Sequence, residues 1–134
     1  MKDMHNSIKV VHAITPQAVG TTGAANGKLS SIIDRQGYES LEFVYSSGTS
    51  ASQADTINPI VLEADATGDS FTSVANDDLL GTESALTLSA AGSKKVGYKG
   101  NKRYVRLRLY GLGTATAIVS AVAIQGNPYD APVA

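Results

Sequence analysis

Four side chains on one predicted strand are the best candidates for a binding site in this sequence. They alternate with apolar residues over the segment 103–110, and they are Tyr104, Arg106, Arg108 and Tyr110. Tyrosine rings and guanidinium groups can stack on bases or sugars, and both are enriched where proteins contact one another. Pairing of the arginines with acidic strands of the same sheet fits the pattern equally well. A protein contact, an intramolecular role and a ligand groove therefore all remain open.

The charged residues are unevenly distributed, although the net charge of the chain is only −1. Acids dominate the segment 34–83, whereas every charged residue of the segment 94–108 is basic. We add Lys94 and Lys95, at the start of the basic segment, to the candidate contact residues. A nucleic-acid site is one interpretation of such a segment. Because a nucleic-acid binder usually carries a clear basic excess, we instead expect acidic and basic strands to be neighbours within the fold or across subunits.

No combination of residues in the sequence indicates catalysis or a metal centre. His5 and His12 are distant from clustered carboxylates, so neither suggests a metal ligand, and we expect His12 to be a partly buried structural residue. The aspartates do not have the spacing of a helical calcium loop. No serine lies in a nucleophile-elbow pattern, the glycine-rich segments lack the ending of a phosphate loop, and the chain has no cysteine. We expect a protein that is not an enzyme and that binds no cofactor or metal.

The length and composition indicate one globular domain. The chain has 134 residues, of which 43% are hydrophobic and 17% are charged. This length allows one domain with a real core, and the low charged fraction suits a surface that other subunits partly cover. The sequence contains no apolar run of the length that a membrane helix needs. The N-terminal residues lack the apolar core of a signal peptide, so we expect a protein that is made and used without export.

The elements that must hold the candidate side chains are predicted to be short β-strands. Alternating or continuous apolar patterns predict strands over 8–14, 29–33, 39–46, 59–65, 71–74, 94–98, 103–110 and 115–124. Pro16 and Pro59 are expected to lie at strand ends, and a helical turn is predicted over 76–80. The loop Gly111–Thr114 is predicted to join the last two strands as a β-hairpin. The almost wholly apolar final strand predicts coverage on both faces, or tight packing against a neighbour.

Short strands separated by frequent turns predict an all-β fold. We expect a single-domain antiparallel β-sandwich of jelly-roll-like form, because no predicted helix is long enough for a parallel α/β sheet. The expected organisation is an N-terminal arm over 1–7, a β-sandwich over 8–125 and an extended C-terminal tail over 126–134.

Several blocks of the sequence together resemble a family of small structural proteins of tailed phages, encoded beside the major capsid protein. The blocks are GYESLEFVYSSG at 37–48, IVLEADATGDSFTSV at 60–74, NDDLLGTE at 76–83, KVGYKGNKRYVRLRLY at 95–110 and GNPYDAPVA at 126–134. The resemblance implies a capsid decoration protein that binds the outside of the assembled head as an oligomer and bridges capsomers. It implies the major capsid protein and further copies of this chain, as a homodimer or homotrimer, as partners. It implies synthesis in the bacterial host cytoplasm and a final place on the virion surface.

Two other functions fit the same sequence features. The first is a structural component of the phage neck or tail, which is also a catalytically silent β-domain. The second is a carbohydrate-binding jelly-roll module for host attachment that uses the Tyr/Arg face of the strand 103–110. We expect neither a membrane nor a nucleic acid as a partner for any of these three functions.

Overall fold

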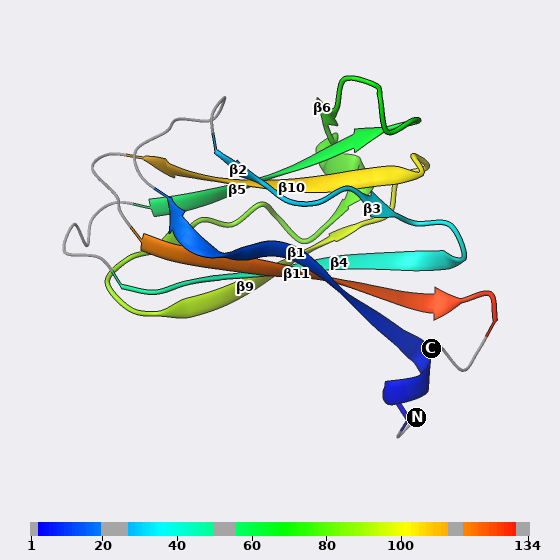
Figure 1. Ribbon diagram of the computed structural model, residues 1–134, viewed down its shortest axis with the longest axis horizontal. Coiled ribbons are helices and arrows are strands. Elements are labelled where there is room, and N and C mark those ends of the chain that lie inside the picture. The colour runs from blue at the N-terminus through cyan, green and yellow to red at the C-terminus, as the bar shows by residue number, and fades with distance from the viewer. Residues whose placement is uncertain (1–2, 20–26, 50–55, 113–116, 131–134) are drawn as a thin grey trace.

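The fold is an antiparallel β-sandwich, as expected from the sequence. The computed structural model describes residues 3–19, 27–49, 56–112 and 117–130, and its strands form two sheets that face each other (Figure 1). Sheet A has five strands in the order β1-β11-β4-β9-β7. They are β1 Ile8–Val19, β11 Ala117–Pro128, β4 Tyr38–Ser47, β9 Gly92–Tyr98 and β7 Leu79–Leu80.

Sheet B is built around two long strands. Its six strands follow the order β2-β10-β5-β6, with β3 paired to β10 and β8 paired to β5. They are β2 Lys28–Leu29, β10 Tyr104–Leu112, β5 Thr56–Ala64, β6 Thr72–Ser73, β3 Ile33–Asp34 and β8 Leu86–Thr87. Two 3₁₀ turns, η1 His5–Ser7 and η2 Asn76–Asp78, are the helical elements of the described residues. Within that part of the chain, no helix is long and apolar enough to cross a membrane.

The core lies between the two sheets and follows the alternation of the sequence. Side chains of successive residues in a strand point to opposite faces. On β4 the inward residues include Phe43 and Tyr45, and on β10 they include Leu107 and Leu109; each of these four is fully buried. The alternation that predicted these two strands therefore also marks their buried faces.

The predicted hairpin between the last two long strands is wrong. β10 pairs with β5, β2 and β3 in sheet B, whereas β11 lies between β1 and β4 in sheet A. The connection after Leu112 therefore crosses from one sheet to the other. Residues 113–116 of this connection lie outside the described part of the chain. Glycine-rich turn chemistry is compatible with a hairpin and with a crossing between sheets, so the local sequence did not separate them.

Both prolines that were predicted to bound strands lie inside them. The β1 register shifts between Ile14 and Gln17, so Pro16 falls at an irregularity of an edge strand, where no regular ladder bond is lost. Pro59 lies within β5. Two residues along, the Val61 backbone N–H donates to the Glu83 carboxylate at 2.7 Å rather than to a strand. Because residues two apart direct their backbone groups to the same side, Pro59 faces away from β10, in the gap between the pairings of β5 with β8 and with β6.

Several boundaries also differ from the sequence-based expectation. The strand predicted over 29–33 is split, because the Ser30 hydroxyl accepts the Leu107 backbone N–H at 2.9 Å and interrupts the ladder. The helical turn is shorter than predicted, since Leu79 and Leu80 form β7. β11 continues to Pro128, three residues into the predicted tail. The predicted arm contains η1, and the backbone N–H and side-chain amide of Asn6 in this turn donate to the Asp3 carboxylate.

Candidate functional site

The candidate residues of β10 share one face, but much of that face is used within the chain. Tyr104, Arg106, Arg108 and Tyr110 are all half-buried on the outer side of sheet B. The Arg106 guanidinium donates through Nε and Nη2 to the Ser30 carbonyl oxygen at 3.0 and 2.7 Å, and it lies 5.4 Å from the centre of the Phe71 ring. Its charge therefore holds the β2–β3 segment onto β10.

The acidic and basic segments are neighbours, as the charge pattern predicted. Lys102 Nζ lies 2.7 Å from Asp65 Oδ2, and Arg103 donates two hydrogen bonds to the Asp34 carboxylate at 2.9 and 2.8 Å. The Arg103 hydrogen bonds hold the pKa of Asp34 below its usual value, against the opposing effect of burial. This part of the basic segment is thus paired inside the chain.

The structure does not bring Lys94 and Lys95 together with the β10 face. Both lysines are exposed on β9, which belongs to sheet A. The six predicted contact residues therefore occupy two sheets. The histidines do not come together either. His12 is exposed rather than partly buried, with Nε2 3.0 Å from the Thr15 hydroxyl, and the described residues contain no cluster of potential metal ligands.

A larger surface was missed by sequence analysis, and it is the outer side of sheet A. The strand registers place one residue row of β1, β4, β7, β9 and β11 on this side. We call these residues the sheet A face: Ile8, Val10, His12, Ala18, Ser40, Glu42, Val44, Ser46, Leu80, Ser93, Lys95, Gly97, Ile118, Ser120, Val122, Ile124 and Gly126.

Within the described residues, the sheet A face exposes several large apolar side chains among serines and glycines. Val10, Ile118 and Leu80 are 60%, 57% and 53% exposed. Among its members, Glu42 is the acidic side chain, and Lys95 and His12 are the basic ones. Partial burial raises the pKa of Glu42, and the charge of Lys95 partly opposes that rise. An apolar surface of this kind on a soluble protein usually marks an interaction site.

The signal for this surface was present in the sequence of β11. Ile118, Val122 and Ile124 alternate with the buried residues of the strand, which made the segment apolar on both faces. Of the two alternatives predicted for this strand, coverage on both faces is wrong within the described residues, since Ile118 is exposed. Within the described residues, the sheet A face of this strand has no second layer packed against it, whereas its other face packs against sheet B.

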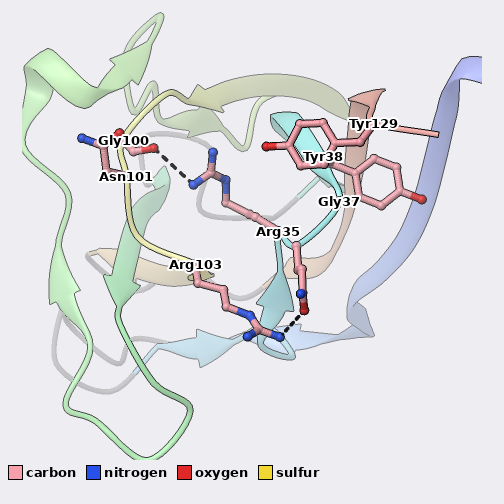
Figure 2. Close-up of a pocket in the computed structure, with 8 residues that line it drawn as sticks. Arg35, Gly37, Tyr38, Gly100, Asn101, Arg103 and Tyr129 are labelled. Carbon is pink, nitrogen blue, oxygen red and sulfur yellow. Dashed lines mark hydrogen bonds between the residues drawn. The ribbon is translucent and has the colours of Figure 1, made fainter.

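A separate polar pocket lies where three segments meet at one end of the sandwich. Figure 2 shows its lining residues, and its volume is about 370 Å³. The segments are the turn 35–37 before β4, the turn 100–103 before β10, and Tyr129 after β11. Gly37 adopts φ +90, a conformation that favours glycine, and its carbonyl accepts the Tyr129 backbone N–H at 2.9 Å.

A buried polar bridge supports this end of the sandwich. The Tyr98 hydroxyl on β9 donates to Glu63 Oε2 on β5 at 2.5 Å, and it accepts the Lys102 backbone N–H at 3.0 Å. The Arg35 guanidinium lies over the Tyr98 ring at 4.8 Å and donates to the carbonyls of Gly100 and Lys102 at 3.2 and 2.6 Å. Burial and the Glu63 hydrogen bond strongly raise the pKa of Tyr98. The bridge therefore joins the two sheets and fixes the turn before β10.

Among the solved structures that share this fold, two align over most of the chain. The CBM22-1 xylan-binding domain of Xyn10C from Paenibacillus barcinonensis aligns with a TM-score of 0.56 and 14% identity, covering 92% of this chain and 88% of that domain. The CBM22-1–GH10 modules of endo-1,4-β-D-xylanase 10B from Clostridium thermocellum, complexed with xylohexaose, align with a TM-score of 0.53 and 10% identity. That alignment covers 92% of this chain and 29% of the xylanase chain.

At these identities the likeness shows a jelly-roll type of β-sandwich and nothing finer. Comparison with protein-family models and with curated protein sequences gave no match.

Proposed function

We propose that this protein is a structural component of a tailed-phage virion, a decoration protein that binds the outside of the assembled head. The sheet A face carries this proposal, because it presents Val10, Leu80 and Ile118 to solvent across all the width of a five-stranded sheet. The resemblance of five sequence blocks to small proteins encoded beside phage capsid genes supports the same role.

The size of the sheet A face favours attachment as an oligomer. Strands lie about 4.8 Å apart and rise about 3.4 Å per residue, so the face from Val10 to Leu80 and from Ile118 to Ile124 measures roughly 20 by 20 Å. This is about half of the roughly 800 Å² that each partner contributes to a standard stable interface. One copy would therefore bind a shell weakly. Several linked copies bind strongly, because each additional contact becomes intramolecular.

The direct test is binding to shells that lack this protein. Heads from a phage with the gene deleted are mixed with purified protein and sedimented. We expect the double variant Val10→Lys and Ile118→Lys to remain in the supernatant, because the added charges must be buried in the contact. The matched control is Leu29→Lys, which places a charge on an exposed apolar residue of sheet B (42% exposed). Equal binding of both variants would remove the sheet A face from the proposal.

Copy number separates the decoration role from the neck or tail role. Peptide mass spectrometry of purified particles gives the ratio of this chain to the major capsid protein. A ratio near one supports a component of the whole lattice, whereas a few copies per hundred place the chain in the neck or tail. Absence from particles would overturn the virion role.

A further inference from the structure

The polar pocket of Figure 2 combines an aromatic wall with a hydrogen-bonding wall. In this view the rings of Tyr38 and Tyr129 lie on one side, and Arg35 extends toward Gly100 on the other. Asn101, which is exposed, also lines the pocket. The volume of about 370 Å³ lies at the lower end of the range of roughly 300–1,000 Å³ that is typical of small-molecule sites.

The tyrosine at the pocket rim has an exposed side chain and a hydrogen-bonded backbone. Tyr129 is 69% exposed. Its backbone N–H donates to the Gly37 carbonyl, so its backbone is tied to the turn that leads into β4. A tyrosine ring offers an apolar body and a polar tip. An exposed ring on a fixed backbone beside several polar groups is therefore suited to a ligand that is itself apolar on one side and polar at its edge.

The polar wall offers donors whose positions are also fixed. Arg35 is held by the carbonyls of Gly100 and Lys102, and its Nη2 has a long contact of 3.5 Å with the Glu39 carbonyl. Its Nε is buried without a hydrogen-bond partner in the described part of the chain. Arg103 is held by Asp34 and by Gln36 Oε1, at 2.6 Å from the latter. The guanidinium groups are therefore held in place before a ligand arrives, which lowers the entropic cost of binding.

We propose that this pocket binds a saccharide, with one pyranose ring against Tyr129 and its hydroxyl groups on Asn101, Gln36 and Arg35. A pyranose has a face of C–H groups and an edge of hydroxyl groups, which matches the two walls. The site is separate from the β10 face, because the turns 35–37 and 100–103 and Tyr129 form it. This function is independent of attachment to a phage head.

The first experiment is a glycan array probed with the full chain. The array includes neutral polysaccharides and polysaccharides that contain uronic acids. Binding to a neutral glycan supports the proposed site, with Arg35 donating to hydroxyl groups. Binding to a glycan that contains uronic acids, if it weakens with added salt, supports the same site with Arg35 as the partner of a carboxylate. The absence of any hit, followed by no binding at millimolar concentrations in solution, would overturn the proposal.

Variants then locate the binding site. For the best glycan, Tyr129→Ala is expected to weaken binding about tenfold or more, as measured by affinity electrophoresis or calorimetry. Asn101→Ala is expected to weaken it as well. Tyr110→Ala on β10 is the matched control and should bind normally. Binding that survives Tyr129→Ala but is lost in Tyr110→Ala would overturn the pocket assignment in favour of the β10 face. Unfolding curves of all three variants verify that the fold is intact, and Tyr129→Ala should still bind phage heads.

Discussion

Removal of the Tyr98 hydroxyl tests the bridge between the two sheets. In the variant Tyr98→Phe the Glu63 carboxylate loses a donor and the Lys102 backbone N–H loses an acceptor. The ring itself stays, so the packing against Arg35 is preserved. The measured effect therefore reports the two hydrogen bonds rather than a cavity.

The expected cost is larger than that of an ordinary buried hydroxyl. A hydrogen bond to a charged group contributes about 1.5–3 kcal/mol, and an N–H left without a partner costs about 1–3 kcal/mol. We expect Tyr98→Phe to lower the free energy of unfolding by about 3 kcal/mol. The matched control is Tyr45→Phe, because the buried Tyr45 hydroxyl makes one neutral hydrogen bond, to the Ser84 carbonyl at 2.7 Å. Its loss should cost about 1 kcal/mol.

The assay is urea unfolding followed by far-UV circular dichroism, because the chain has no tryptophan and both variants alter tyrosine fluorescence. The denaturant slope should be unchanged, so that the midpoint reports stability. Combination with Glu63→Gln in a double-mutant cycle should give less than additive losses, with a coupling of about 1 kcal/mol or more. If Tyr98→Phe costs no more than Tyr45→Phe, or if the cycle is additive, the bridge contributes nothing specific and our account of this end of the sandwich is wrong.

Three further predictions concern pH, the sheet A face and the arginines. Burial raises the pKa of Tyr45 to about 12 and also raises the pKa of Tyr98. The stability that these neutral phenols contribute is therefore full below about pH 10 and is lost as the pH rises toward and through about pH 12, by up to about 1.4 kcal/mol per pH unit for each group. The double variant Tyr45→Phe and Tyr98→Phe should lose less stability than the unchanged protein between about pH 9 and about pH 11. Gly97→Ala should cost about 1–3 kcal/mol, because its Cβ would lie 2.5 Å from Glu42 Oε2 and 2.9 Å from Leu80 Cβ, whereas Gly126→Ala on the same face, with its nearest atom 3.7 Å away, should cost less in the same urea assay. Arg106→Ala should lower the melting temperature more than Arg103→Ala, because Arg103 and Asp34 form an exposed pair worth at most about 1 kcal/mol; the reverse order would contradict the role of Arg106 in holding Ser30.

The sequence predicted what depends on local alternation. The period of two around Leu107 identified both β10 and its buried face, and the same pattern identified β4. The partner of each strand depends on contacts between distant residues, which alternation does not reveal. This is why the link after Leu112 was predicted as a hairpin, although the two strands belong to different sheets.

The candidate sites show the same division between local and distant information. The Tyr/Arg face of β10 was visible as a pattern, but the capture of Arg106 by Ser30 joins residues 76 positions apart. The polar pocket combines residues near 35, 100 and 129, which no short motif connects. For the sheet A face, the sequence signal was the second apolar row of β11, which contains Ile118. That row could be interpreted only once the structure showed that the other face of β11 is the buried one.

The central place of β11 in sheet A has a consequence for the order of events during synthesis. β11 is the strand that joins β1 to β4, and it pairs Ile8 with Gly126. Until the ribosome has released residues 117–128, β1 has no strand partner in sheet A, and the edge of β4 that pairs with β11 stays unpaired. Pairings of such long sequence separation form slowly. We therefore expect sheet A to be completed only after β11 has left the ribosome, and nascent chains that lack β11 to be the form of this protein that is most prone to aggregation.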